Sequence, residues 1–272
     1  PVTKKPVTKK PVTKKPVTKK LVTKKLVTKK RRLLKTETLP RLSLRKKAKR
    51  MARAKRTARS PSPRRVRLLP SRRKTVDLAD QAELDFCGEM RELCEDISRR
   101  VPELSHVVMR DVLVCITRAR SGGRTGLWAK LTPLRFEGGS RLGMRRGQRY
   151  VIEPLVVDGR EQLYILTFCL PRFLNLTYRE KLVTVFHELF HIGPQFDGDH
   201  RRFAGRYHMH SPRAELFDLE AERLCDLYLA TSPAPLACRF LRHRCATLLA
   251  RHGAITGLTI PVPKLIPVDE AA

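Results

Sequence analysis

Apolar side chains recur every three or four positions between residues 77 and 100, at Leu84, Cys87, Met90, Leu93 and Ile97. This spacing places them on one face of a helix. Pro102 follows directly, and a proline rarely continues a helix, so the helix is expected to end before it. The first regular element of the globular part is therefore predicted to be an amphipathic helix.

The pattern then changes to that of β-strands. Segments 106–120 and 127–136 are rich in β-branched and alternating apolar residues, which predicts two strands. Because the glycine-containing turn 121–126 separates them, we expect these strands to form a β-hairpin. Segments 149–157 and 162–170 predict one or two further strands.

Helical spacing returns after the strands. Thr177 and Glu180 have the spacing of a capping box, in which each side chain bonds to a backbone N–H at the start of a helix. We therefore expect a helix to begin near Tyr178. Gly193-Pro194 is expected to end it, because neither residue favours a continued helix.

Two more helices are predicted at 211–229 and 238–253, the second ended by Gly253. Strands followed by helices favour an α+β domain, which we place at residues 76–250. The proline-rich residues 251–272 are expected to form an extended or disordered C-terminal tail.

Charge separates the domain from the first quarter of the chain. Residues 1–75 contain 31 of the 58 Lys and Arg residues and a single acid, Glu37, in a chain of net charge +32. They begin with four PVTKK and two LVTKK repeats, whose five-residue period matches neither a helix nor a strand. A segment with so much like charge and so few large apolar groups cannot offset its ordering entropy. We therefore predict that residues 1–75 are a disordered basic tail.

A flexible polycation binds phosphate polymers by releasing counterions. DNA or RNA is therefore the expected partner of residues 1–75, and the composition resembles the Lys/Ala/Pro-rich tails of linker-histone-like bacterial proteins. The sequence has no apolar run of the ~20 residues that a membrane span needs and no secretory signal at its start. Its seven cysteines form no C-x-x-C pair and lie mostly in apolar surroundings, which is typical of reduced core thiols. We expect a cytoplasmic protein, with association with the nucleoid as an extension of DNA binding.

The segment VTVFHELFH carries the candidate chemistry. His187 and His191 are four residues apart, so they share one face of the predicted helix, with Glu188 directly after the first. H-E-x-x-H on a helix is typical of a zinc site in which the Glu acts as general base. Five of the eight histidines lie between residues 187 and 210, as a site with several ligands requires.

The third ligand is left open by spacing alone. The position six residues beyond the second histidine, used by metzincins, is Asp197, but Pro194 replaces the glycine of that motif. Other candidates are downstream histidines or a glutamate of the next helix, as in thermolysin. These candidates are His200, His208, His210, Glu215, Glu220 and Glu222.

The segment HELFHIGPQFDGDHRRFAGRYHMHSP resembles the core motif of a phage and bacterial zinc metallopeptidase family. The resemblance implies His187, His191 and His210 as zinc ligands and Glu188 as general base. It also implies a zincin-like fold, with a small antiparallel or mixed sheet packed on the HExxH helix. Asp197 and Asp199 in its FDGD loop are expected either to orient a ligand imidazole or to form an Asx-turn.

The long gap before the third histidine is similar to that of SprT-like zinc peptidases, whose peptidase activity acts near DNA. The sequence thus favours a Zn²⁺-dependent peptidase acting on a protein or peptide, localised to nucleic acid by residues 1–75. The alternative is a non-catalytic nucleic-acid-binding protein whose domain holds zinc structurally.

Overall fold

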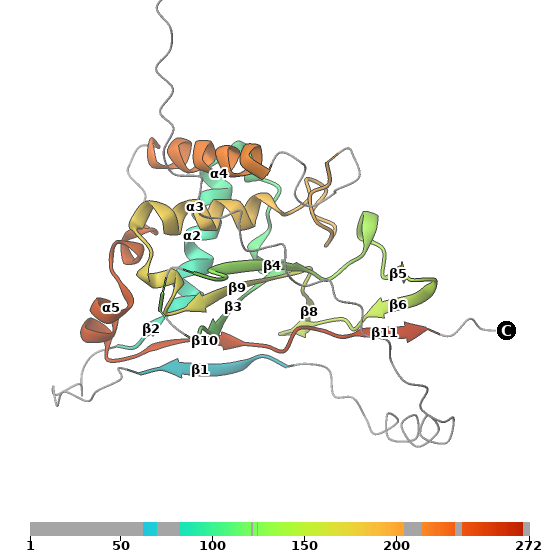
Figure 1. Ribbon diagram of the computed structural model, residues 1–272, viewed down its shortest axis with the longest axis horizontal. Helices are drawn as coiled ribbons and strands as arrows, with labels where there is room; N and C mark the ends of the chain where they lie inside the picture. Colours follow the sequence, from blue (N-terminus) through green and yellow to red (C-terminus); the bar gives the residue numbers. More distant parts are fainter. Residues whose placement is uncertain are drawn as a thin grey trace, which may run out of the picture. The chain divides into compact units, whose positions relative to one another are not determined.

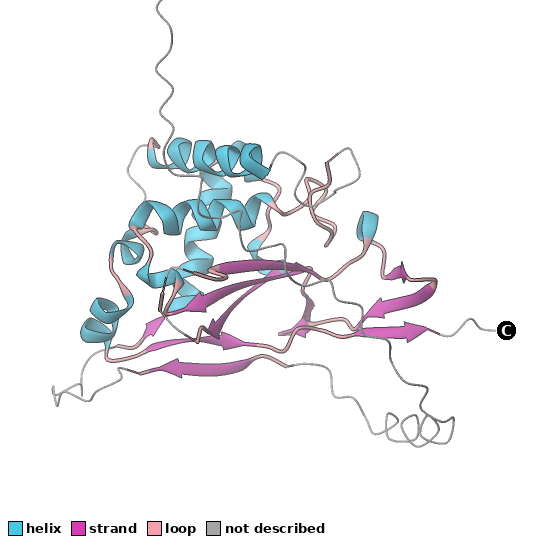
Figure 2. Ribbon diagram, in the orientation of Figure 1, coloured by secondary structure: helices cyan, strands magenta, loops and turns pink. Residues whose placement is uncertain are grey.

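The computed structural model describes residues 62–69, 82–120, 122–123, 125–203, 214–231 and 236–268, which all belong to the compact unit Arg59–Ala272. Helices and small mixed sheets occur together in this unit, which confirms the α+β class (Figure 2). Most of the basic tail predicted at residues 1–75 lies outside the described residues.

The helices are α2 (Phe86–Arg100), α3 (Tyr178–Phe190), α4 (Ala214–Leu229) and α5 (Cys245–His252). Short 3-10 helices are η2 (Pro102–Leu104), η3 (Met109–Asp111), η4 (Glu137–Gly139), η5 (Phe173–Asn175) and η6 (Arg239–Arg242). The strands are β1 (Arg64–Leu68), β2 (Leu84–Asp85), β3 (Val112–Arg118), β4 (Ala129–Pro133), β5 (Leu142–Arg145), β6 (Gln148–Ile152), β7 (Val156–Val157), β8 (Arg160–Glu161), β9 (Tyr164–Leu170), β10 (Ile255–Thr259) and β11 (Leu265–Val268).

The central sheet has the strand order β3-β9-β4, with β9 parallel to β3 and antiparallel to β4. The predicted hairpin between 106–120 and 127–136 is therefore wrong, because β9 lies between the two strands. The sequence of β9, YILTFCL, is buried at all but one position. A strand that is apolar on both faces favours a central place in a sheet, and this place separates β3 from β4.

Alternate residues of β3 face two different cores. Val112, Val114 and Ile116 join the main core with α2, α3 and α4, whereas Leu113 and Cys115 join a smaller core on the other face. Figure 1 shows α2, α3 and α4 on one side of the sheet and β10 on the other. The sheet is thus buried on both faces, which explains its near-continuous apolar sequence.

Strand β10 pairs antiparallel with β1 and parallel with β2. Its first residue, Ile255, is fully buried, and β11 pairs with β6. Residues 251–272, expected as a tail, therefore supply two strands to the sheets. Residues 64–68, placed by sequence in the disordered tail, form β1 along the edge of β10.

The single helix predicted at 238–253 is wrong in its first half, which forms η6 and two extended residues, His243 and Arg244, before α5. The buried Lys181 amine of α3 donates to the carbonyls of Leu241 and His243, at 2.9 and 2.6 Å. A continuous helix would use these carbonyls within itself. The end at Gly253 is confirmed, with φ +66°.

All seven cysteines are buried and free, as expected of reduced core thiols. Among the helices of the described residues, none has both the length and the apolar character needed to cross a bilayer.

Candidate metal centre

Helix α3 carries the histidine pair, and the local sequence determines where it starts. The predicted capping box is confirmed: the Thr177 hydroxyl accepts from Glu180 N–H at 3.3 Å, and the Glu180 carboxylate accepts from Thr177 N–H at 2.8 Å. The helix ends at Phe190, with His191 as its C-cap. His187 therefore lies in the last turn of α3 and His191 directly after it. Figure 1 shows this end of α3 beside α4.

The two imidazoles converge. The Nε2 atoms of His187 and His191 are 3.1 Å apart, and their ring planes are 80° to one another. Two imidazoles bound to one tetrahedral zinc at ~2.0–2.1 Å would place their nitrogens about 3.3 Å apart. The spacing of this pair therefore fits two ligands of a single metal ion.

Helix α4 supplies the side chains behind the pair. Asp218 Oδ1 lies 3.0 Å from His187 Nδ1 and accepts its proton as a hydrogen bond. This bond leaves the Nε2 lone pair of His187 directed at His191, which is the tautomer that a metal ligand needs. Phe217 packs against both rings, at 4.8 Å from His187 and 4.5 Å from His191. Sequence reasoning missed the role of Asp218, since no motif spacing links residue 218 to the histidines.

Glu188 lies on another side of α3, against the edge strand β4 of the central sheet. Its Oε2 accepts a 2.7 Å hydrogen bond from Leu131 N–H, and the residue is 8% exposed. Burial raises the pKa of the Glu188 carboxyl above its ordinary value, although His187, the Leu131 N–H and Lys130 oppose the rise. A carboxylate whose pKa is raised by burial accepts a proton more readily, as a general base must.

The loop after α3 folds back on the end of the helix. Ile192 and His200 form an isolated antiparallel bridge, and Arg201 N–H donates to His191 C=O at 2.7 Å. Asp199 accepts two bonds from Arg202, at 2.6 and 3.0 Å, and one from Gly138 N–H at 3.2 Å. The loop is therefore fixed both to α3 and to the η4 segment.

Asp197 Oδ1 accepts from Asp199 N–H at 3.1 Å, the geometry of an Asx-turn. Of the two expectations for the FDGD aspartates, the turn is thus the one confirmed for Asp197. Among the described contacts, neither aspartate bonds to His187 or His191. The carboxylate at the histidine pair is instead Asp218 of α4.

A third metal ligand is not evident in the part of the chain that the structure describes. No group of three His, Cys, Asp or Glu side chains able to hold a metal occurs among these residues. The ring of His200 lies 5.8 Å from that of His191, and Glu220 is engaged with Arg223 at 2.7 Å. Glu215 and Glu222 lie on exposed positions of α4. His208 and His210, the remaining candidates, lie outside the described residues.

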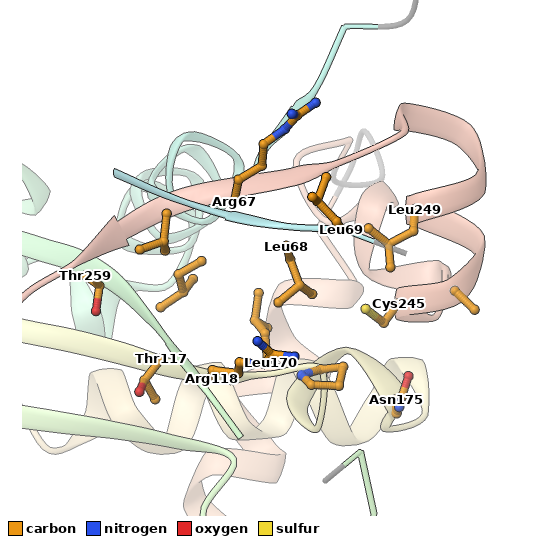
Figure 3. A pocket seen from close by; sticks show the side chains of 14 residues that line it. Arg67, Leu68, Leu69, Thr117, Arg118, Leu170, Asn175, Cys245, Leu249 and Thr259 are labelled. Atoms are coloured by element: carbon orange, nitrogen blue, oxygen red, sulfur yellow. The ribbon is translucent and has the colours of Figure 1, made fainter. Parts of the chain in front are cut away.

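A cavity of about 810 Å³ lies elsewhere, between β1, α5 and the ends of β3 and β9 (Figure 3). Figure 3 shows Leu68 pointing into this space and Arg67 pointing away from it. Its described lining contains no His, Asp or Glu, and Cys245 is the single potential metal ligand there. The histidine pair therefore remains the candidate site.

Comparison with known proteins agrees with this location. Residues 86–216 match the model of the family described as "Putative phage metallopeptidase". Neither curated proteins nor solved structures gave a match to the chain. The matched segment runs from α2 into α4 and contains His187, Glu188, His191 and the loop that follows. The family resemblance expected from the sequence is confirmed over residues 86–216, where the chain is similar to this family.

Proposed function

We propose that the protein is a zinc-dependent peptidase whose metal is held by His187, His191 and a third ligand, His210. The observation that carries the proposal is the 3.1 Å approach of the two Nε2 atoms, with Asp218 bound to the far nitrogen of His187. Two imidazole nitrogens this close together suit a pair of ligands to one metal ion. The similarity of residues 86–216 to the phage metallopeptidase family supports a metal-dependent peptidase in general, and the choice of zinc is our own.

Bound zinc supplies a coordinated water of lowered pKa and polarises a carbonyl oxygen. His187 and His191 would hold the ion, and Asp218 keeps His187 in the tautomer whose Nε2 is free to bind. The adjacent Glu188 suits the role of general base. The Leu131 N–H holds its Oε2, so that Oε1 is the atom to take up a proton and later deliver it to the leaving amine.

His210 is our choice for the third ligand because it occupies the position of the family's later histidine. His208, two residues earlier, would share a face with it in an extended segment. The helix α3 beside a small mixed sheet is the packing that a zincin-like peptidase would use, and we extend the proposal to that fold. The proposed substrate is accordingly a protein or peptide.

The basic tail is proposed to localise the peptidase to DNA or RNA, in the cytoplasm or at the nucleoid. The support is the charge of residues 1–75, which contain 31 Lys and Arg and one acid. Deletion of residues 1–58, which ends before β1, is expected to remove most DNA affinity while zinc content stays unchanged. Undiminished DNA affinity at moderate salt would place the nucleic-acid surface elsewhere.

The test of the peptidase compares wild type with Glu188→Gln on a mixed protein substrate, with zinc content measured for both. Glu92→Gln is a matched control, because Glu92 is an exposed residue of α2 remote in sequence from the site. We expect equal zinc content in all three proteins and a roughly 10²–10⁴-fold slower hydrolysis by Glu188→Gln alone. Zinc binding without hydrolysis by any of them would refute the peptidase and favour a structural zinc in a nucleic-acid-binding protein.

A further inference from the structure

A second concentration of positive charge lies in the folded domain. Around the turn of the β5–β6 hairpin, residues 141–149 read RLGMRRGQR and carry four arginines without an acid. We call this segment the arginine hairpin. It is separate from the basic tail and from the candidate metal centre, and neither accounts for it.

The turn geometry places charge at the tip of the arginine hairpin. Arg146 and Gly147 have φ values of +52° and +77°, as the two central residues of a type I′ turn require. At the base, Gly143 lies against the Phe136 ring, where a Cβ would come within 2.1 Å. The hairpin is therefore packed on the domain at one end and projects Arg146 at the other.

The arginines nearest the tip are not neutralised. Arg141, near the base, pairs with Glu161 at 2.8 Å. Arg145 and Arg146 are exposed, and neither forms an ion pair with any residue that the structure describes. Two adjacent guanidinium groups that form no ion pair with a described residue create a local site of positive potential, which attracts an anionic partner.

Apolar side chains accompany this charge. The register pairs Leu142 with Val151 and Met144 with Arg149, so these four side chains share one face of the sheet. Ile266 of β11 pairs with Val151 and joins the same face. Leu142 is 51% exposed, Met144 71% and Ile266 41%. Of the arginines, Arg149 lies on this apolar face, Arg145 on the opposite face and Arg146 in the turn, so cationic groups surround the apolar side chains.

We propose that the arginine hairpin binds nucleic acid, with Arg145 and Arg146 at backbone phosphates and Met144 against sugars or bases. A two-stranded β-ribbon fits the major groove of a duplex, and arginine binds phosphate with paired N–H donors. A second copy of the chain is a poor partner for this surface, because the arginines of the two hairpins would face and repel one another. The inference adds a surface beyond the tail and does not rest on peptidase activity.

The first test measures duplex DNA binding by the whole chain over a range of salt concentrations. The variant Arg145→Gln/Arg146→Gln is compared with Arg118→Gln/Arg120→Gln, a control with the same charge change at exposed positions at and just after the C-terminal end of β3. Two lost phosphate contacts should flatten the salt slope by about two and weaken binding roughly tenfold. The control should match wild type. Equal losses in both variants would overturn the proposal, because they would report net charge alone.

A second test places a probe on the surface itself. Since the native thiols are buried, a maleimide photo-crosslinker can be directed to Met144→Cys, or to Leu227→Cys on α4 as an exposed control. Cross-linking to DNA should be several-fold greater from position 144 than from position 227. Equal yields would overturn the proposal.

Two alternative partners of the arginine hairpin, an anionic membrane and a second copy of the chain, would give different results in the same variants. If Arg145→Gln/Arg146→Gln lowers binding to anionic phospholipid vesicles and leaves DNA binding unchanged, the surface binds membranes and the proposal fails. If it only converts a dimer to a monomer in light scattering, the surface is a self-association interface and the proposal also fails. Unchanged hydrolysis alongside lost DNA binding would support the proposal and separate it from the peptidase activity.

Discussion

Asp218 of α4 bonds to His187 Nδ1 at 3.0 Å, on the side of the imidazole opposite the approach to His191. This bond joins two helices at the candidate metal centre and fixes which nitrogen of His187 is available. A carboxylate in this position typically raises the affinity of a histidine for a metal.

Asp218→Ala is therefore expected to weaken zinc binding about 10–100-fold while the fold is kept. Asp218→Asn should have a smaller effect, because its amide oxygen can still accept from Nδ1–H. Zinc affinity measured by competition with a chelator checks both.

Asp226→Asn is the matched control for this experiment, because Asp226 lies on the same helix and pairs with Arg179, away from the histidines. Its zinc affinity should equal that of wild type. If Asp218→Ala binds zinc as tightly as this control, Asp218 does not orient a ligand.

Lys181 is expected to make stability depend on pH. Burial, with Arg244 nearby, lowers the pKa of its amine from 10.5 to about 8, while Cys245 acts in the opposite direction. Between pH 8 and 10.5 the unfolded chain then binds more protons than the folded one. The contribution of this group to the free energy of unfolding therefore rises with pH across that window, by at most about 3 kcal/mol.

The measurement is denaturant unfolding of wild type and Lys181→Met at pH 7 and pH 10. The free energy of unfolding of wild type, relative to that of Lys181→Met, should be larger at pH 10 than at pH 7. A difference that is independent of pH would mean that Lys181 has an ordinary pKa.

The cysteines should be unreactive in the native protein. Burial raises the pKa of Cys87 to about 11 and those of Cys94 and Cys225 to about 12, and every cysteine is at most 7% exposed. Thiolates react and thiols do not, so a chromogenic disulfide reagent at pH 8 should label all seven only after denaturation. Rapid native labelling of several thiols would contradict the packing described.

Tyr228 should contribute to stability through a buried hydrogen bond. Its hydroxyl donates to Asp96 Oδ2 at 2.8 Å, and Asp96 also accepts from Arg100 at 2.9 Å. Tyr228→Phe leaves one carboxylate oxygen with fewer donors and is expected to cost about 1.5–3 kcal/mol in the free energy of unfolding. Tyr150→Phe on the half-buried β6 serves as the control, with an expected change under about 0.5 kcal/mol. If a urea titration gave the same change in the free energy of unfolding for both variants, the Tyr228–Asp96 hydrogen bond would not stabilise the fold.

The features of the fold that depend on residues close together in the sequence were predictable from the sequence. The start of α3 follows from Thr177 and Glu180, because a capping box is completed within one turn of helix. The end of α5 at Gly253 follows from the ease with which glycine adopts positive φ.

The pairing of strands that are far apart in the sequence could not be predicted from local sequence patterns. Strand order places β9 between β3 and β4, and only the complete set of packing contacts selects this order over a local hairpin. Strand β10 follows a helix and precedes a proline-rich stretch, so its burial depends on β1 and β2, which are far away in sequence. In the candidate site, His187, Glu188 and His191 are marked by one helical motif, whereas Asp218 comes from a different helix and depends on how α3 and α4 pack.

The measurement that tests the metal centre most directly is an anomalous difference map from crystals of the zinc-loaded protein. We expect one strong peak within about 2.1 Å of both His187 Nε2 and His191 Nε2, with a histidine from residues 208–210 as the third ligand. Zinc bound at another place, or bound without these two nitrogens, would contradict the proposed metal centre.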